Sequence, residues 1–307
     1  MTARRALITL LLAGLCSNCG TGCSPPSNRQ PSAAARIVSL APSVTETLFA
    51  LGAGPEVVGV SSYCDYPARV GGLPRVGSFL TPNVEQIIAL RPTLIIGLAI
   101  ASNQRQIKAL ESMGFPILLV REETLGDIER SIEQIGDRTG RSKEAQALLA
   151  HINGHFTSVK KRLAGRSSPR VLMLVGHQPM VAVGSGSFLD ELLRTVHADN
   201  IARFAGQQWP RLTMEYVVRT APEVIIDGQM GSDPTAPDSF WSRFATIPAV
   251  RDHRVFGYED STLRPGPRVW QSLETLAAMV HPEAFNVASD SSSPKASAAQ
   301  QTIGGDR

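Results

Sequence analysis

Cysteine is scarce in this chain, and its distribution limits what can hold the fold together. Of four cysteines in 307 residues, three (Cys16, Cys19 and Cys23) lie within the first 23 residues. The remaining thiol, Cys64, cannot form an internal disulfide, so the fold must depend on hydrophobic cores. We interpret Cys64 as a small buried side chain rather than a metal ligand.

A large excess of charge of either sign is also missing. The formal net charge is +3 at pH 7, and no dense basic run is interleaved with aromatic residues, which argues against a nucleic-acid partner. The sequence contains no G-x-S-x-G motif, no Walker loop and no convincing Ser/His/Asp order, so we expect no enzyme. Its six histidines are scattered, and we expect no resident cofactor and no metal site. The length and the 43% apolar content indicate a globular chain of two ordinary domains.

The longest apolar run near the N-terminus is too short to span a bilayer. It covers residues 6–15, follows two arginines and is typical of a secretory leader. The sequence GTGC, which ends at Cys23, is similar to a lipoprotein cleavage box, except that Gly20 stands where Leu is usual. We therefore predict a signal peptide over 1–23 with a lipid on Cys23, and plain secretion is the alternative. Residues 24–35, rich in Pro, Ser and Ala, would then form a flexible linker.

One long amphipathic stretch organises the rest of the chain. Ser142 is a plausible N-cap and Gly165 a plausible C-cap of a helix over 142–165, roughly 33 Å long. We predict that this helix joins two lobes. Its apolar residues recur at intervals of three and four, which places them on one face: Ala145, Leu148, Leu149, Ile152, Phe156, Val159 and Leu163.

Two histidines lie four residues apart on this predicted helix. His151 and His155 are placed to share a metal ion, but the sequence shows no third ligand. We interpret them as part of a solvated helix flank.

Strand and helix patterns alternate on both sides of the long helix, which predicts an α/β fold with parallel sheets. We assign a first lobe to 36–141, a second lobe to 166–287 and a disordered tail to 288–307. The predicted strands are 36–40, 57–60, 93–97, 117–120, 170–175, 180–183, 224–227 and 254–258. The predicted helices are 43–51, 83–90, 103–113, 125–139, 188–196, 213–220, 241–244 and 268–280.

Two local patterns are interpreted as helix starts. Ser43 followed by Glu46 has the spacing of a capping box, after Pro42 breaks the first strand. The turn Gly184–Ser187 is weakly similar to a phosphate-binding loop. The simpler interpretation, which we favour, is that Ser187 caps the next helix.

The two lobes contain a repeated segment. Asn83–Ile96 parallels Thr213–Ile226, and in each a glutamate (Glu85 or Glu215) precedes a proline by seven residues. Two similar lobes with a connector form a cleft, and open α/β sheets bind ligands at the carboxyl ends of their strands.

Four segments together resemble a known family. They are SSYCDYP at 61–67, VGSF at 76–79, the segment from Glu85 to Ile96, and WPRLTME at 209–215. They are similar to the helical-backbone substrate-binding proteins of ABC importers, and most of all to the cobalamin-binding branch. The resemblance covers about residues 36–281. It implies two Rossmann-like lobes joined by one long helix, with a corrinoid ligand clasped in the cleft between them. It also implies a periplasmic, monomeric protein that delivers its ligand to a permease and ATPase complex.

The resemblance assigns ligand-binding roles to several loop residues. Tyr63, Phe79 and Trp209 would contact the corrin or its nucleotide loop, and aromatic rings offer large contact area at little entropic cost. Asp260 and Arg264 would hydrogen-bond the amide-rich rim of the ligand. His177, which follows a second-lobe strand, is a further candidate. The alternatives are ordinary core packing for the aromatics and a surface ion pair for Asp260 with Arg264.

The repeated glutamates are candidates for docking. In the family, the glutamates that match Glu85 and Glu215 face arginines of the two permease subunits, and such charge pairs orient association. The simpler interpretation is that both stabilise a helix dipole.

The sequence leaves other ligands open. Haem and a ferric siderophore are the alternatives. A siderophore would call for a cluster of cleft arginines, and Arg211, Arg264 and Arg268 do not settle that question. A metal-ion binder or a secreted α/β enzyme is a weaker alternative.

Overall fold

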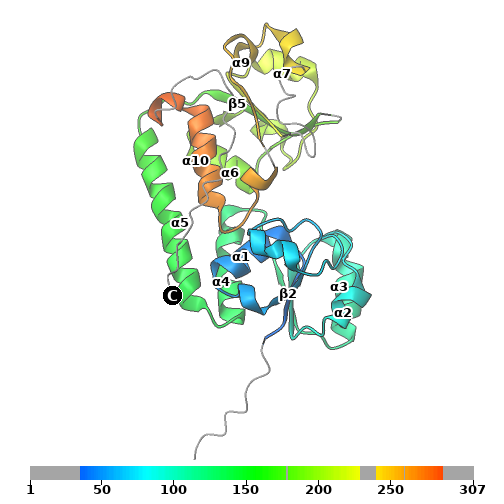
Figure 1. The fold of residues 1–307 in the computed structure, drawn as a ribbon. Helices are drawn as coiled ribbons and strands as arrows, with labels where there is room; N and C mark the ends of the chain where they lie inside the picture. The colour runs from blue at the N-terminus through cyan, green and yellow to red at the C-terminus, as the bar shows by residue number, and fades with distance from the viewer. Residues whose placement is uncertain (1–34, 178, 229–239, 259, 286–307) are drawn as a thin grey trace, which may run out of the picture. The chain divides into compact units, whose positions relative to one another are not determined.

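The computed structural model describes residues 35–177, 179–228, 240–258 and 260–285 (Figure 1). The predicted signal peptide, the lipid attachment at Cys23, the linker up to residue 34 and the tail over 288–307 lie outside these residues. None of the helices in the described part of the chain is long and apolar enough to cross a membrane.

The first lobe is built on a parallel four-stranded sheet with the strand order β2-β1-β3-β4. Its strands are short and mostly buried, as expected where helices cover both faces of a sheet. Ile95 packs against one hydrophobic cluster, with residues of α2 and α3, while Leu94 and Ile96 pack against another, with residues of α1 and α4. The elements are β1 (Ile37–Ser39), α1 (Pro42–Ala50), β2 (Val57–Val60), α2 (Val84–Ala89), β3 (Leu94–Leu98), α3 (Gln104–Ser112), β4 (Ile117–Val120) and α4 (Leu125–Arg138).

The second lobe contains a mixed sheet. Its main order is β6-β5-β8-β9, and β7 pairs with the start of β5. We expected parallel strands throughout, but β6 runs antiparallel to β5, because so short a connection permits only a hairpin. The elements are β5 (Arg170–His177), β6 (Met180–Ala182), α6 (Phe188–Thr195), β7 (Asp199–Asn200), α7 (Met214–Thr220), β8 (Val224–Asp227), α9 (Pro248–Arg251), β9 (Val255–Gly257) and α10 (Val269–Val280).

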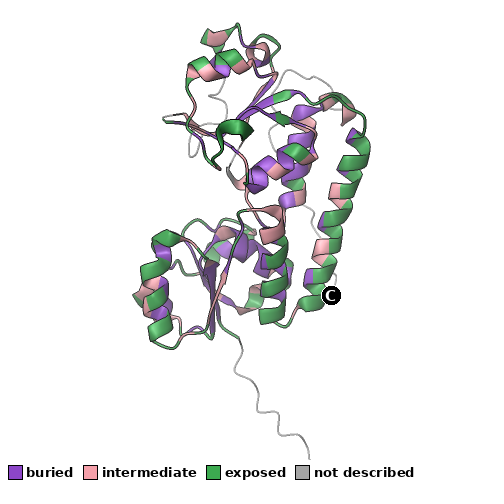
Figure 2. Ribbon diagram, turned by 180° about the vertical axis from the view of Figure 1, so that it is seen from behind, coloured by how far each residue is buried: buried purple, intermediate pink, exposed green. Residues whose placement is uncertain are grey.

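The long helix is present as α5 (Ser142–Leu163). It packs on α4 of the first lobe and on α6 and α10 of the second. Every residue of the predicted apolar stripe belongs to or packs on one core that contains residues of both lobes. The opposite face of α5 is mostly exposed (Figure 2). This shared core makes the described chain one continuous packing unit rather than two independent ones.

The ends of α5 differ in part from the prediction. Ser142 is the first helical residue rather than the N-cap, and its hydroxyl donates to Asp137 Oδ1 at 2.7 Å. Gly165 follows the helix with φ near 78°, a left-handed conformation that favours glycine.

The capping box predicted at Ser43 and Glu46 is wrong. Helix α1 begins at Pro42, and Ala41 at the N-cap makes no side-chain hydrogen bond. Proline is well suited to the first helical position, because its missing N–H would lack a helical partner there anyway. Glu46 is therefore free of a capping role, and it forms the contacts between lobes described below.

The helix start predicted at Ser187 is confirmed. Its hydroxyl accepts a hydrogen bond from Asp190 N at 3.2 Å. Gly184 has a different role, because a Cβ there would lie 2.0 Å from the carbonyl oxygen of Gln207. The glycine permits a close approach to the segment that carries Trp209.

Candidate functional site

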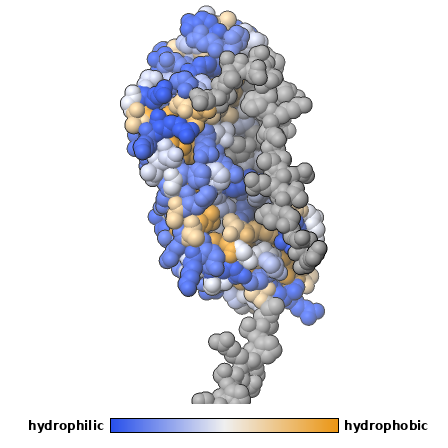
Figure 3. Space-filling model, turned by 60° about the vertical axis from the view of Figure 1, so that its left-hand side comes forward, coloured by the Kyte–Doolittle hydropathy of each residue, from blue (hydrophilic) through white to orange (hydrophobic). Residues whose placement is uncertain are grey.

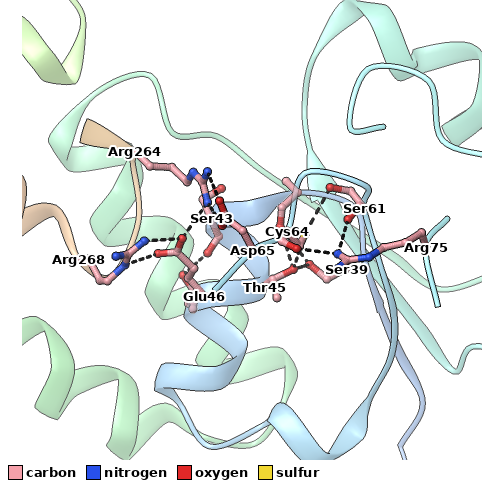
Figure 4. Close-up of polar contacts among 12 residues, drawn as sticks. Ser39, Ser43, Thr45, Glu46, Ser61, Cys64, Asp65, Arg75, Arg264 and Arg268 are labelled. Atoms are coloured by element: carbon pink, nitrogen blue, oxygen red, sulfur yellow. Dashed lines mark hydrogen bonds and ion pairs between the residues drawn. The ribbon is translucent and has the colours of Figure 1, made fainter. Parts of the chain in front are cut away.

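The loop 61–67 follows β2 and is anchored through its middle residue. Cys64 is buried, with its Sγ 3.1 Å from Thr45 Oγ1 and 3.3 Å from Ser61 Oγ. Arg75 donates to the carbonyl oxygens of Ser61 and Cys64 at 3.2 and 2.6 Å (Figure 4). The interpretation of Cys64 as a buried packing residue is confirmed. The same anchoring holds Tyr63 at the surface, 58% exposed.

Two of the predicted ligand-binding aromatics are in contact. The rings of Tyr63 and Phe79 meet edge to face, with centroids 5.7 Å apart. Phe79 is half-buried against the core, and its carbonyl oxygen accepts from Asn103 Nδ2 at 3.2 Å. Phe79 thus packs against the ring of Tyr63 and restricts its movement. This reduces the side-chain entropy that Tyr63 would lose when a ligand binds.

Trp209 lies on a fixed backbone in the second lobe. The carbonyls on either side of it, those of Gln208 and Pro210, accept hydrogen bonds from Gly184 N and Ala182 N, both at 2.9 Å. Its side chain is 43% exposed. Among the described rings it contacts neither Tyr63 nor Phe79, so a shared wall formed by these aromatics remains a prediction.

Exposed large apolar side chains are few among the described residues. On the face shown in Figure 3, hydrophilic residues predominate and hydrophobic ones form smaller patches. Two of the predicted contact residues, Tyr63 and Trp209, belong to the exposed set. That set consists of Tyr63, Tyr66, Leu80, Met113, Phe204, Trp209 and Val218.

A network of ion pairs links the two lobes. Glu46 of α1 accepts from Arg264 Nη1 at 3.0 Å and from Arg268 Nε at 2.8 Å (Figure 4). Arg264 Nη1 also donates to Asp65 Oδ1 at 2.8 Å. The side chain of Glu46 is 3% exposed and that of Asp65 is 56% exposed, so Glu46 is the buried centre of the network.

Charge and hydrogen bonding reinforce each other in this network. The hydrogen bond from Arg264 lowers the pKa of Asp65, and the hydrogen bonds to Glu46 raise the pKa of Arg268. The Arg268 guanidinium also lies over the ring of Tyr66, 4.1 Å from its centroid. Such a stacked cation ties α10 to the loop 61–67.

Arg264 therefore joins the lobes, whether or not it contacts a ligand. The sequence offered a surface ion pair as the alternative to ligand binding, yet its partner Glu46 is buried and belongs to the other lobe. Sequence reasoning missed Glu46 because its spacing from Ser43 had been assigned to a capping box. Asp260 begins the 3-10 helix Asp260–Leu263, and its side chain lies outside the described part.

Glu122 is a second buried carboxyl that the sequence did not reveal. Burial raises its pKa to about 7, although hydrogen bonds with Ser43 and Ser131 act in the opposite direction. Ser131 Oγ donates to Glu122 Oε1 at 3.3 Å, while Oε2 has no hydrogen-bond partner among the described residues. Glu122 stands in the charged run Arg121–Glu123, which looks like surface sequence.

His177 belongs to a polar cluster at the carboxyl ends of β5 and β8. Its Nε2 hydrogen-bonds Asp227 Oδ2, which also accepts from Trp241 Nε1 at 2.7 Å. The ring of Phe240 lies 4.5 Å from that of His177. The side chain of His177 is only 14% exposed, so the cluster fixes its ring. Asp227 could have been noticed as the polar residue that ends the apolar strand VIID.

The two glutamates of the repeat have equivalent local positions. Glu85 lies in the first turn of α2 after the N-cap Asn83, and Glu215 lies in the first turn of α7 after the N-cap Thr213. Both are exposed, and among the described residues neither forms an ion pair. Glu85 also lines a groove of about 540 Å³ with Met113. Both carboxylates are thus accessible to a partner.

The histidine pair of α5 is not a plain solvated flank. His155 packs on Trp270 of α10, with ring centroids 4.2 Å apart, and its Nδ1 lies 2.7 Å from Glu274 Oε1. In the described part of the chain, no three or more His, Cys, Asp or Glu side chains are grouped so as to hold a metal ion.

The described residues form two α/β lobes, and an exposed aromatic side chain lies on each, Tyr63 on the first and Trp209 on the second. Residues 37–262 match the family described as periplasmic binding protein. The chain belongs to this family, whose members bind substrates for transport, and this confirms the family expected from the sequence.

Individual relatives support the same conclusion. An uncharacterized ABC transporter substrate-binding lipoprotein of Bacillus subtilis is 32% identical over 81% of both chains. A vitamin B12-binding protein of Salmonella paratyphi A is 28% identical over 71% of this chain and 81% of its own. The apo structure of a periplasmic haem-binding protein from Roseiflexus is 27% identical, with a TM-score of 0.74 over 82% of this chain and all of the other.

Proposed function

We propose that this protein is the substrate-binding component of an ABC importer and that it carries cobalamin or a related corrinoid. Family membership supports the transport role, and a relative named as vitamin B12-binding supports the ligand. The observation that carries the choice of ligand is the pairing of the cationic side chains between the lobes.

Among the residues that the structure describes, the charges of that network balance. The guanidiniums of Arg264 and Arg268 are paired with the carboxylates of Glu46 and Asp65. An anionic ligand such as haem or a ferric siderophore would need cations not already neutralised by the protein. A corrinoid, whose rim is rich in neutral amides, needs hydrogen-bonding groups and aromatic surface instead. The balanced network therefore favours a corrinoid.

Exposed aromatic rings on both lobes supply the apolar surface. Tyr63, supported by Phe79, presents a ring from the first lobe, and Trp209 presents one from the second. In this proposal they contact the corrin or its nucleotide loop, while Arg264 and Asp260 bond the amide rim. His177, held by Asp227, contributes a polar group from the second sheet.

Haem is the second candidate. The similarity to a haem-binding structure favours it, and so does a histidine that a carboxylate orients, since His is a frequent haem ligand. If haem is the ligand, His177 should contribute most to the binding affinity. If a corrinoid is the ligand, the rings of Tyr63 and Trp209 should contribute most.

Calorimetric titration separates the candidates. The protein is titrated with cyanocobalamin, with haem and with a ferric siderophore, each in a separate experiment. We expect saturable one-to-one binding of cyanocobalamin alone, with submicromolar affinity. Binding of haem or siderophore without cobalamin would refute the corrinoid proposal and keep the transport role.

Variants then test the aromatic contacts. We expect Trp209→Ala to weaken cobalamin binding by at least about 2 kcal/mol, or about 30-fold, as removal of a central aromatic anchor does. Phe204→Ala is the matched control, because Phe204 is 83% exposed and has no proposed ligand contact. Equal affinities of Trp209→Ala and the unaltered protein would remove Trp209 from the site.

Delivery completes the proposed function. Glu85 and Glu215 dock on arginines of the permease, and the permease works with its ATPase. A leader and a lipid on Cys23 would keep the protein, as a monomer, at the periplasmic side of a membrane. The exposure of both glutamates supports docking.

A further inference from the structure

A compact cluster of imidazole, indole and carboxylate groups lies where α5 packs on α10. It consists of His151 and His155 from α5 and of Trp270 and Glu274 from α10. The proposed transport function uses none of these residues. Their arrangement has the features of a small metal-binding site.

The two imidazole rings have a separation that suits a shared metal ion. Their centroids are 4.6 Å apart, with an angle of 68° between the ring planes. Two rings that bind one ion through nitrogens at about 2.0–2.1 Å, with a nitrogen–metal–nitrogen angle of about 90–109°, have centroids about 4.5–5.2 Å apart. A spacing of four residues on one helix face is also the spacing of the two histidine ligands in zinc-binding helices. The centroid separation of the two rings is therefore compatible with two nitrogens that bind one ion.

Glu274 prepares His155 for this role. Its Oε1 lies 2.7 Å from His155 Nδ1, and an ionised carboxylate only accepts hydrogen bonds, so Nδ1 carries the proton. In the neutral ring the lone pair is then on Nε2, which is the nitrogen left for a metal. Histidine ligands in metalloproteins usually have such a carboxylate partner, which fixes the tautomer and raises basicity.

Trp270 limits the movement of both rings. Its ring centroid lies 4.2 Å from that of His155 and 5.2 Å from that of His151. Because Trp270 belongs to α10 and both histidines belong to α5, this packing holds the pair from a second helix. Less rotamer entropy is lost when a metal binds to rings that are already confined.

We propose that His151 and His155 bind a divalent transition-metal ion through two ring nitrogens, with Glu274 as the positioning carboxylate. Water fills the remaining positions, because the described residues supply no third ligand. Imidazole nitrogen selects Cu²⁺, Ni²⁺ and Zn²⁺ over Mg²⁺ and Ca²⁺, with Cu²⁺ bound most tightly. The site is distinct from the ligand-binding residues proposed above and does not depend on the transport function.

Trp270 provides a direct test, because Cu²⁺ bound near an indole quenches its fluorescence. The protein, purified without a histidine tag, is titrated with Cu²⁺ and in parallel with Mg²⁺, and bound metal is counted after dialysis. We expect saturable quenching at one Cu²⁺ per chain and none with Mg²⁺. Ni²⁺ and Zn²⁺ should compete for the site, more weakly than Cu²⁺.

Variants assign the signal to the cluster. We expect His151→Gln and His155→Gln each to weaken Cu²⁺ binding at least about tenfold, and Glu274→Gln to weaken it by about 10-fold through its effect on His155. Trp270→Phe should abolish most of the quenching while one Cu²⁺ still binds by dialysis. His253→Asn is the matched control: His253 is exposed and has a φ of 53°, which Asn tolerates.

The outcomes are clear in either direction. Loss of binding in both α5 variants with full binding in His253→Asn supports the site. Quenching that does not saturate, or that persists unchanged in His151→Gln and His155→Gln, overturns the proposal. Far-ultraviolet circular dichroism of each variant shows whether a loss is due to unfolding, and the conservative Glu274→Gln change tests the same site without removing a ligand.

Discussion

Replacement of Glu122 by glutamine should stabilise the protein in a manner that depends on pH. Burial raises the pKa of Glu122 from an ordinary value near 4.5 to about 7 in the folded protein. The folded state therefore binds more protons than the unfolded chain between these two values. The protonated Glu122 therefore makes its full contribution to the unfolding free energy below pH 4.5. This contribution is lost as the pH rises through about 7.

The expected magnitude follows from the two pKa values. Their difference corresponds to about 3 kcal/mol of unfolding free energy, at about 1.4 kcal/mol per pKa unit. Glutamine has nearly the shape of the neutral carboxyl and never ionises. Glu122→Gln should thus match the unaltered protein near pH 4.5 and exceed its stability by about 3 kcal/mol at pH 8.

Urea unfolding at several pH values between 4.5 and 8 measures this difference. Glu123→Gln is the matched control, because its side chain is 54% exposed and pairs only loosely with Arg121, at 3.4 Å. The control should change stability by less than about 0.5 kcal/mol at every pH. The reasoning would be refuted if the gain in unfolding free energy of Glu122→Gln over the unaltered protein were the same at every pH, or absent at pH 8. Either result would mean that ionisation of the buried carboxyl does not destabilise the folded protein.

Two further predictions concern the contacts between lobes and with a partner. Glu46→Gln should destabilise the protein by about 3 kcal/mol in urea unfolding, because it leaves two guanidiniums without their buried carboxylate. Asp65→Asn, at a carboxylate that is 56% exposed, should cost less than about 1 kcal/mol; equal effects would contradict the assignment of Glu46 as the centre of the network. The double variant Glu85→Ala with Glu215→Ala should retain cobalamin affinity in calorimetry but lower the initial uptake rate of cells that depend on the protein by about tenfold. Normal uptake by this variant would rule out docking through these carboxylates.

The long helix shows what a sequence pattern predicts well. The apolar stripe from Ala145 to Leu163 specified both the existence of α5 and the face that it buries, and every member of the stripe packs as expected. The repeat likewise placed Glu85 and Glu215 correctly in the first turns of α2 and α7. Such predictions succeed because helical periodicity and capping depend on residues close together in the chain.

The loop 61–67 shows where sequence reasoning covered only part of a site. The burial of Cys64 was predicted from its residue type, and the loop position of Tyr63 from its place after a predicted strand. The partner of Asp65, by contrast, is Arg264, which follows the 3-10 helix Asp260–Leu263 and lies 199 positions later in the chain. No local pattern contains that information.

The sequence by itself determined the α/β class, the family, the long connecting helix and the aromatic loop at 61–67, because each of these depends on local periodicity or on a contiguous motif. Only the tertiary structure decided that Glu46 joins the lobes instead of capping α1, that Glu122 is buried with a raised pKa, and that His155 is held by Trp270 and Glu274. The physical reason is that burial and ion pairing depend on which distant side chains meet, and a charged residue in the sequence looks the same whether its partner is water or a buried guanidinium.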